Sequence, residues 1–542
     1  MSIARSSALM ATGTIVSRIL GFVRAVMLAA TIGVTTNVSD AFGVANQLPN
    51  NVYAIIAAGV LSAVLVPQII KSKSHSDGGA GYIDRLLTLV ICVFAIVTVV
   101  TTMAAPLLVG LYTQGWSGSQ LALATAFAYW CLPQLFFYGL YSVLGEVLNA
   151  NSRFGPFMWS PVLNNVISIA GLGLFIWLFD ADPTGRVNES LWQGDRITLL
   201  AGTATLGVIA QAIVLFWSWR KVDLKFKPNF HWRGVGLGPA LKAAAWSLGM
   251  VLVTQIGGLV QTAVSSRVIS DRTAAAGAIA GVAAAGIAWL IFMLPHSVFT
   301  VSIATAYFTK MSGHAHRGEL DEMKLDLTKG LRIIGAIAAL ATAGLIVLAY
   351  PVARIFVGEY PATAALGNVI IALMFGLVPF SFVFMIQRAF YALEDTRTPF
   401  WFTTLQIAVH ITGSLTMSVT VPSQWLVASL GGLTSLSVLV QALAAYWLLR
   451  RKIGGFGNNG LASALVRFLL AALLAGAVGF GVLHLLGGAG EGSFAVKSVV
   501  AALTASAVVA LAMVLAYLGA LRFLGVTEAD ELLARAKSLA KR

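Results

Sequence analysis

Long apolar runs alternate with short polar segments along the chain, and fourteen of these runs are long enough to cross a membrane as helices. A helix needs ~20 apolar residues to span ~30 Å of hydrocarbon. A membrane β-barrel would instead show segments of ~10 residues with alternating polarity, which the sequence lacks. The expected spans are 8–33, 40–70, 86–112, 121–149, 157–179, 197–219, 240–268, 274–309, 331–357, 365–391, 399–418, 425–449, 461–486 and 496–521. The pattern predicts an all-α polytopic membrane protein.

The second and eighth runs are unusually long, and each contains a proline, Pro49 and Pro295. Proline removes a helix hydrogen bond and clashes with the preceding turn, so we expect a bend at both positions. Composition agrees with the membrane class: 58% of the 542 residues are hydrophobic, 10% are charged, and the mean hydropathy is +0.86.

The net charge is +14, and most of the basic residues that cause it fall on one side of the expected membrane spans. With a cytoplasmic N-terminus, 26 basic residues fall in cytoplasmic segments and six on the opposite side, as the positive-inside rule requires. Three more arginines, Arg18, Arg24 and Arg467, lie within spans. We therefore expect both termini in the cytoplasm, contacts with anionic lipid head groups, and no nucleic-acid partner.

Two similar hairpins indicate an internal repeat. "LGEVLNANSRFGPFMWSPVLNN" (144–165) joins spans four and five, and "IQRAFYALEDTRTPFWFTTLQ" (386–406) joins spans ten and eleven. Parallel repeats are typical of transporters, with the substrate site at the repeat interface. We expect two six-helix lobes related by a pseudo-two-fold repeat. The predicted divisions are an N-terminal lobe at 1–225, a C-terminal lobe at 226–452, an extra helix pair at 453–525 and a cytoplasmic amphipathic tail at 526–542.

Two permanent charges stand near the middle of the first span, in "SRILGFVRAVMLAA" (17–30). An arginine in hydrocarbon costs ~2.5–3.5 kcal/mol on insertion scales, so each is either a structural lock against another helix or part of a functional site. Gly13, Ser17, Gly21 and Arg24 share one helix face, where small residues permit close packing or leave a cavity. Because the guanidinium fork matches phosphate oxygens, the functional interpretation of Arg18 and Arg24 is an anion-binding cavity suited to a diphosphate.

Other polar side chains lie in or beside the spans. Asp40 opens the second span, where it could hold and release an arginine of the first span or serve as a helix N-cap. Gln47 and Asn50 flank the bend at Pro49, where amides commonly satisfy freed backbone groups. Glu146, near the cytoplasmic end of span four, fits a local salt bridge better than a proton relay.

Sequence signatures of enzymes are missing. There is no GxxxxGK[ST] loop for nucleotide phosphates, and "GVGLGP" (234–239) has glycines without the lysine or a preceding strand. No acidic cluster is visible that would hold the Mg²⁺ of a membrane transferase. We expect a transporter rather than an enzyme, with no metal site and no cofactor beyond a coupling ion of unknown identity.

The segments "SRILGFVRAVMLA" and "SDAFGVANQLPN", followed by "VP" near the end of span two, resemble the MviN/MurJ family of lipid II flippases. This family belongs to the multidrug/oligosaccharidyl-lipid/polysaccharide exporter superfamily. The two hairpins and the fourteen spans match it over essentially the whole chain. The resemblance implies that Ser17, Arg18, Arg24, Asp40 and Asn50 are the cavity and gating residues.

The resemblance also implies an activity, which is the movement of lipid-linked peptidoglycan precursor, lipid II, from the inner to the outer leaflet of the bacterial cytoplasmic membrane. Such proteins work by alternating access and serve cell-wall synthesis, with cell-wall synthesis or division proteins as conceivable partners. Several charges that relatives often carry are missing at Ala25, Tyr53, Ala54, Ala58, Trp289 and Leu290. Either the cavity uses fewer arginines, or Arg267 and Arg272 at the outer end of span seven compensate.

Two alternative functions stay open on the sequence. An exporter of another polyprenyl-linked glycan, or of drugs, would use the same fold. A structural scaffold of a cell-wall complex would tolerate neutral substitutions at Arg18 and Arg24. Because a nucleotide motif is missing, the driving force of a transporter should be the membrane potential or an ion gradient.

Overall fold

The structure is a computed structural model that describes residues 3–57, 80–151, 153–187, 189–219, 226–231, 237–272, 278–455 and 460–526. All regular secondary structure within these ranges is helical. The later part of the second expected span, including Ala58, lies outside the described residues, as does the amphipathic helix expected from residue 527 onward.

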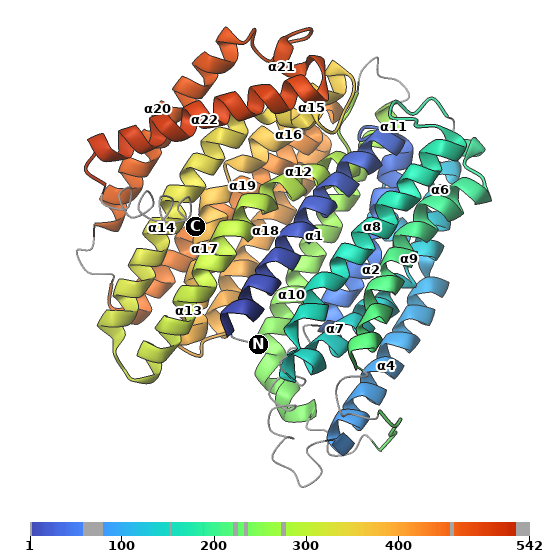
Figure 1. Ribbon diagram of the computed structural model, residues 1–542, viewed down its shortest axis with the longest axis horizontal. Coiled ribbons are helices and arrows are strands. Elements are labelled where there is room, and N and C mark those ends of the chain that lie inside the picture. Colours follow the sequence, from blue (N-terminus) through green and yellow to red (C-terminus); the bar gives the residue numbers. More distant parts are fainter. Residues whose placement is uncertain are drawn as a thin grey trace. The chain divides into compact units, whose positions relative to one another are not determined.

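The chain divides into two compact units, residues 1–273 and 274–542 (Figure 1). Unit 1 contains α1 (Ile3–Ile32), α2 (Asn37–Ile56), α4 (Ala80–Met103), α5 (Ala105–Tyr112), α6 (Gly118–Cys131), α7 (Gln134–Ala150), α8 (Phe154–Phe179), η2 (Glu189–Leu191), α9 (Gly194–Trp219), α10 (Leu237–Ser266) and α11 (Val268–Arg272). The lobe boundary expected at residue 225 is a different division, based on the repeat, and stays a prediction. Helix α10 belongs to unit 1 because it packs against α2 and α5.

Unit 2 follows the same all-helical pattern. It contains α12 (Val282–Pro295), η3 (His296–Thr300), α13 (Val301–His316), α14 (Leu320–Val347), α15 (Ala349–Arg354), α16 (Tyr360–Met374), α17 (Leu377–Ala392), α18 (Arg397–Thr420), α19 (Ser423–Ile453), α20 (Leu461–Leu485), α21 (Phe494–Lys497) and α22 (Val499–Phe523). The extra helices α20 and α22 pack side by side, and α20 also packs against α14 (Figure 1). The Tyr517 hydroxyl of α22 donates to the Ala336 carbonyl oxygen of α14 at 2.7 Å, which ties the pair to the unit.

The fourteen-span, all-α membrane fold is confirmed. Among the described helices, eleven spans are long and apolar enough to cross a membrane, and the bent pair α16–α17 makes a twelfth. The two other expected spans are also helical, as α2 and α18. Every apolar run predicted from the sequence therefore contains a helix.

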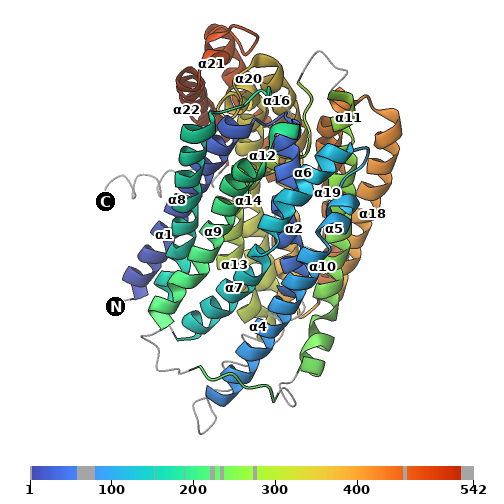
Figure 2. The ribbon, with the colours of Figure 1, turned by 90° about the vertical axis from the view of Figure 1, so that its right-hand side faces the viewer.

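Helices α1, α8 and α9 lie in a row in unit 1 (Figure 2). The small residues predicted on one face of α1 are the reason α8 approaches so closely. A Cβ atom added at Gly13 would lie 2.9 Å from the ring of Trp159, and the Asn165 side-chain nitrogen donates to the carbonyl oxygen of Ser17 at 2.9 Å. The stripe on α1 is thus a packing surface for α8.

Two spans are broken in the middle, and the breaks occur at equivalent places. Helices α6 and α7 are separated at Leu132–Pro133, and α16 and α17 bend by 43° around Gly376. Gly376 lies 243 positions after Pro133, the same offset that separates Pro399 from Pro156 in the two hairpins. The break in span ten has a local cause, because Pro379 clashes with the carbonyl four residues earlier and cannot donate to it.

A hydroxyl group from a neighbouring helix satisfies the carbonyl groups at each break. Thr205 of α9 donates to the Trp130 carbonyl oxygen at 2.7 Å. Ser435 of α19 donates to the carbonyl oxygens of Ala372 and Leu373 at 2.8 and 3.0 Å. Leu373 again lies 243 positions after Trp130. Within hydrocarbon no water can serve these groups, so the break and its hydroxyl partner belong together.

The same two helices share a second polar position, which confirms the internal repeat. Gln211 lies six residues after Thr205, and Gln441 lies six residues after Ser435. Gln211 accepts a hydrogen bond from Asn164 of α8 at 2.9 Å, and Gln441 donates to Thr403 of α18 at 3.1 Å. A glutamine at the same spacing thus joins span six to span five and span twelve to span eleven, through different partners and with opposite hydrogen-bond direction.

The two prolines flagged in the long spans behave differently. Helix α2 continues through Pro49 to Ile56. After Pro295 the chain forms η3, a π-helical turn, before it continues as α13. Such π-turns are local irregularities that are frequent at functional sites.

Gly376 should be required for the close approach of α19. A Cβ atom there would lie 3.0 Å from the Cα and Oγ atoms of Ser435, and the helix backbone has little freedom to move. We expect Gly376→Val to destabilise the protein by ~1–3 kcal/mol, as overpacking does, seen as a lower unfolding temperature of the purified protein. The matched control is Gly344→Val, where nothing lies within 4 Å of the added Cβ. Equal unfolding temperatures for the two variants would contradict this account of the bend.

Candidate functional site

The two intramembrane arginines lie in different surroundings on α1. Arg24 follows Gly13, Ser17 and Gly21 on the face that packs against α8, and its side chain is half-buried. Arg18 is exposed on the surface of unit 1. The helical twist between the two positions explains the difference, because six residues correspond to about 120° around the axis.

Arg24 lines a small pocket among α1, α2, α8 and α9. The other lining residues are Leu28, Phe42, Ser168, Leu172, Leu200, Thr203 and Ala204. The free volume is about 10 Å³, which admits about one water molecule. The pocket is too small for a lipid head group, so Arg24 would have to leave it, or the pocket would have to widen, before the guanidinium could bind a diphosphate.

The remaining predicted binding residues are distributed along the same two helices. Ser17 accepts a hydrogen bond from Asn165 of α8, which fits a structural contact. Asn50 is exposed on α2, and Gln47 is half-buried. Asn51, their neighbour, receives a hydrogen bond on its carbonyl oxygen from Gln255 of α10 at 2.6 Å, so an amide of another helix contacts the backbone two residues after Pro49.

Asp40 forms a buried ion pair with Arg272. The carboxylate oxygen Oδ2 lies 3.0 Å from Nη1 of Arg272, and the side chains are 0% and 8% exposed. The partner thus comes from α11, 232 positions along the chain, rather than from the neighbouring first span. The alternative role of Asp40 as an N-cap is wrong, since α2 begins at Asn37 and its cap is Thr36. Asp40 lies in the first turn of α2, where the helix dipole also favours a negative charge.

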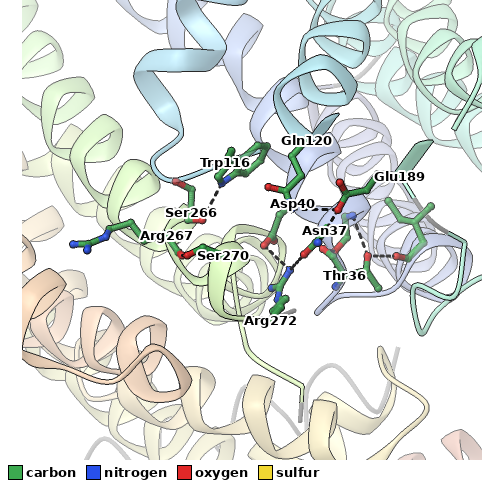
Figure 3. Close-up of polar contacts among 12 residues, drawn as sticks. Thr36, Asn37, Asp40, Trp116, Gln120, Glu189, Ser266, Arg267, Ser270 and Arg272 are labelled. Atoms are coloured by element: carbon green, nitrogen blue, oxygen red, sulfur yellow. Dashed lines mark hydrogen bonds and ion pairs between the residues drawn. The ribbon is translucent and has the colours of Figure 1, made fainter. Parts of the chain in front are cut away.

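Polar side chains of α2, α6 and η2 surround this pair (Figure 3). Arg272 also contacts the Asn37 side-chain oxygen at 3.4 Å, while the Asn37 nitrogen donates to Glu189 at 2.7 Å. Gln120 of α6 donates to the same Glu189 oxygen at 3.3 Å. Because Glu189 can only accept, it fixes the Asn37 amide with its oxygen toward Arg272.

The end of α10 is held to the same region. The indole nitrogen of Trp116 donates to the Ser266 carbonyl oxygen at 2.9 Å, and the Ser266 hydroxyl accepts from the backbone N–H of Gln114 at 2.9 Å. Arg267 directs its guanidinium away from the Asp40 cluster (Figure 3). Of the two outer arginines expected to compensate for missing charges, Arg272 is therefore engaged in a buried pair in this structure.

Aromatic clusters occupy two of the places where relatives were expected to carry charges. Tyr53 stacks on Phe94 at 6.0 Å between ring centroids and lies 5.9 Å from Tyr138. In unit 2, Trp289 stacks on Phe292 at 5.2 Å. Aromatic side chains at these two positions therefore contact other aromatic rings.

Glu146 is half-buried on α7 and forms no ion pair with any residue that the structure describes. The local salt bridge expected for it stays a prediction. Three residues of this cluster were not predicted from the sequence: Asn37, Gln120 and Glu189. Each of the three is a polar residue in a loop or at a helix start on the same side of the membrane, and this was the only signal in the sequence. The sequence does not show which of these loops contact one another.

Comparison with known proteins agrees with this architecture. The family model "Lipid II flippase MurJ" matches residues 28–504. The "Probable lipid II flippase MurJ" of Rhizobium meliloti (strain 1021) is 25% identical over 434 residues, which cover 77% of this chain and 76% of the relative. The protein of the same name from Haemophilus influenzae is 26% identical over 416 residues, 71% of this chain and 75% of the relative.

Solved structures show the same fold. "Lipid II flippase MurJ, inward closed conformation" matches with a TM-score of 0.73 at 19% identity, over 97% of this chain and 100% of that one. An inward-facing multidrug resistance MATE family transporter of the MOP superfamily matches with a TM-score of 0.61 at 17% identity, over 82% and 99% of the two chains. At these identities, the structural likeness concerns the fold alone.

Breaking the Asp40–Arg272 pair should destabilise unit 1. Removing one member of a buried pair leaves an uncompensated charge, which costs ~3–5 kcal/mol. We expect Asp40→Asn and Arg272→Gln each to lower the unfolding temperature of the purified protein, and the double variant to lose less than the sum of the two. Arg186→Gln, which removes an exposed arginine of the linker between α8 and α9, is the matched control and should have a small effect. Additive losses in the double variant would show that the two residues do not act as a pair.

Proposed function

Because the chain belongs to the lipid II flippase MurJ family, we propose that it moves lipid II from the inner to the outer leaflet of the bacterial cytoplasmic membrane. The observation that carries the proposal is the family match over residues 28–504. The all-helical, multi-pass fold and the intramembrane arginines of α1 are consistent with it. Lipid II carries a diphosphate, and arginine is the side chain best suited to bind one in a low-dielectric site.

We propose that both termini are cytoplasmic and that the Asp40–Arg272 cluster faces the outside. The support is the distribution of basic residues, with 26 on one side and six on the other. In this orientation, the cluster that joins α2, α6 and α11 closes the outer end of unit 1. Alternating access then requires that this cluster open when the substrate is released outside.

The two arginines have different roles in this proposal. Arg18 is exposed in the structure, so the diphosphate can reach it without a movement of α1. Arg24 lies in a pocket that admits about one water molecule, so it joins only when α1 moves relative to α8 and α9. Asn50, exposed on α2, is a further polar contact for the head group, and Asp40 acts as the gating residue.

The energy for transport comes from the membrane potential or an ion gradient in this proposal, since the sequence contains no nucleotide-binding loop. Moving one charge through 100 mV supplies about 2.3 kcal/mol, which is enough to bias two conformations. Proteins of cell-wall synthesis or division are the partners that such an activity would serve.

Substituting the arginines tests the proposal directly. In cells depleted of their own flippase, we expect Arg24→Ala to abolish delivery of lipid II to the outer leaflet, measured with an externally added lipid II-degrading enzyme. Arg24→Lys should restore little of the activity, because lysine keeps the charge but loses the bidentate fork. Arg467→Ala, which removes an intramembrane arginine of α20, is the matched control. Normal delivery with Arg24→Ala, at equal protein levels in the membrane, would remove this residue from the mechanism.

A binding experiment separates the main alternative, an exporter of another polyprenyl-linked glycan or of drugs. The purified protein should bind lipid II more tightly than other lipid-linked diphosphates, and binding should weaken in the double variant Arg18→Ala, Arg24→Ala. Equal affinity for unrelated lipid-linked diphosphates, or tight binding of cationic drugs, would favour the alternative.

A further inference from the structure

Arg388 lies four residues before the end of α17, and three aromatic rings surround its guanidinium. The guanidinium carbon lies 4.8 Å from the ring centroid of Phe384, 5.7 Å from that of Phe308 and 5.9 Å from that of Tyr391. Phe308 belongs to α13, which packs against α17 (Figure 1). Aromatic faces attract a cation, so the rings hold the charge in place without a hydrogen bond.

The hydrogen-bonding groups of Arg388 stay open for a ligand. Every N–H of a guanidinium is a donor, and none of those of Arg388 has a hydrogen-bond or ion-pair partner among the described residues. The side chain is half-buried, but its nitrogen atoms reach the surface of unit 2. Arg354 shows the contrast, since its guanidinium serves as a structural link. It donates to the carbonyl oxygens of Val357, Val496 and Lys497.

The surface of α13 beside this guanidinium is polar. Between residues 301 and 310 the exposed positions of α13 are Ser302, Thr305, Ala306, Thr309 and Lys310. A helix against hydrocarbon exposes large apolar side chains instead, as α22 does with Val500, Leu503, Leu511 and Leu515. Thr305 precedes Phe308 by three residues and is therefore its neighbour on the helix surface. Arg388 thus lies at the border of a polar face that suits water or a head group.

The framework that the two units share does not require a charge at this position. The offset of 243 positions pairs Arg388 with Gly145 of α7. At Gly145 the ring of Phe157 occupies the space that a side chain would need. The arginine is therefore a feature of unit 2 alone, so packing of the repeat does not explain it.

The depth of Arg388 in the membrane suits the phosphate of a lipid. Four helical residues correspond to ~6 Å along the axis, and the head-group layer is ~5–7 Å thick on each side of the hydrocarbon. With the hairpin at 393–396 in the cytoplasm, as the topology proposed above requires, Arg388 lies close to the head groups of the inner leaflet. Arg18 and Arg24 stand near the middle of their span, so the two groups of arginines differ in depth.

We propose that Arg388 binds the diphosphate of a polyprenyl-linked lipid at the cytoplasmic end of unit 2. The guanidinium fork matches phosphate oxygens two at a time, and the rings behind it leave that edge free. A phospholipid phosphate has the same chemistry, but a diphosphate offers more acceptor oxygens and more charge to the unpaired donors. The identity of the lipid rests on the proposed function, whereas binding of a phosphate group at Arg388 does not.

Binding of undecaprenyl diphosphate to the full chain in nanodiscs of zwitterionic lipid tests the proposal. We expect Arg388→Gln to weaken binding about tenfold, because hydrogen bonds from a charged group are lost. Arg388→Lys should weaken it less, since the charge remains while the fork is lost. Undecaprenol, which has the same chain without phosphate, should bind equally to the wild-type protein and to Arg388→Gln.

Arg451→Gln is the matched control. Arg451 also stacks on a ring, that of Trp447 at 3.8 Å, and belongs to the last turn of α19, so its loss removes the same charge from the same side of the membrane. We expect this variant to bind undecaprenyl diphosphate like the wild-type protein.

Four results would overturn the proposal. They are normal binding of undecaprenyl diphosphate by Arg388→Gln, an equal loss of undecaprenol binding, an equal loss in Arg451→Gln, or displacement of the diphosphate by phosphatidylglycerol at the same concentration. If Arg388→Gln binds and delivers lipid II normally, this site fails and the proposed function stands. If the wild-type protein binds undecaprenyl diphosphate through Arg388 but delivers no lipid II, the proposed function fails and this site stands.

Discussion

Hydrocarbon contains no water that could bind a free backbone group, and this constraint explains why hydroxyl side chains lie buried beside the two broken spans. Each interruption of a span needs a partner from a neighbouring helix. Thr205 serves the break at Pro133 and Ser435 serves the one at Gly376. Ser381 instead contacts two side chains of the turn after Pro295, those of His296 and Thr300. Bent spans are useful to a transporter because they can change shape. Each bend, however, requires a hydrogen-bonding side chain at one position of a neighbouring helix.

The buried charges at the end of unit 1 also need a partner from another helix. Asp40 and Arg272 are removed from solvent together, and Asn37, oriented by Glu189, supplies an additional acceptor to the guanidinium. Helix α11 is the last described element of unit 1, so this pair also fixes the point from which the chain continues into unit 2. A buried pair of this kind contributes little net stability compared with apolar residues, but loss of one partner leaves the other charge buried and unpaired, which is costly.

The sequence was sufficient to predict the helical spans and the face of α1 that packs against another helix. Both depend on periodic patterns within one segment. Fourteen apolar runs gave fourteen helical spans, and Gly13, Ser17 and Gly21 do face another helix. Local patterns also indicated irregularity at Pro295, although not that it would be a π-turn. The partner of Asp40 could not be predicted, since many basic residues were equally compatible with it and only the packing of α11 selects Arg272. The break at Gly376 was missed for a similar reason, because its cause, Pro379, stands inside an unbroken apolar run.

The linker between α8 and α9 shows how the two halves diverged. Residues 180–193 connect spans five and six, whereas only residues 421–422 connect the equivalent spans eleven and twelve. The longer linker contains η2, and with it Glu189, which orients Asn37 beside the Asp40–Arg272 pair. The contact between η2 and the start of α2 therefore depends on the length of this linker. The two-residue connection between spans eleven and twelve has too little chain to place a carboxylate beside a neighbouring helix in the same way.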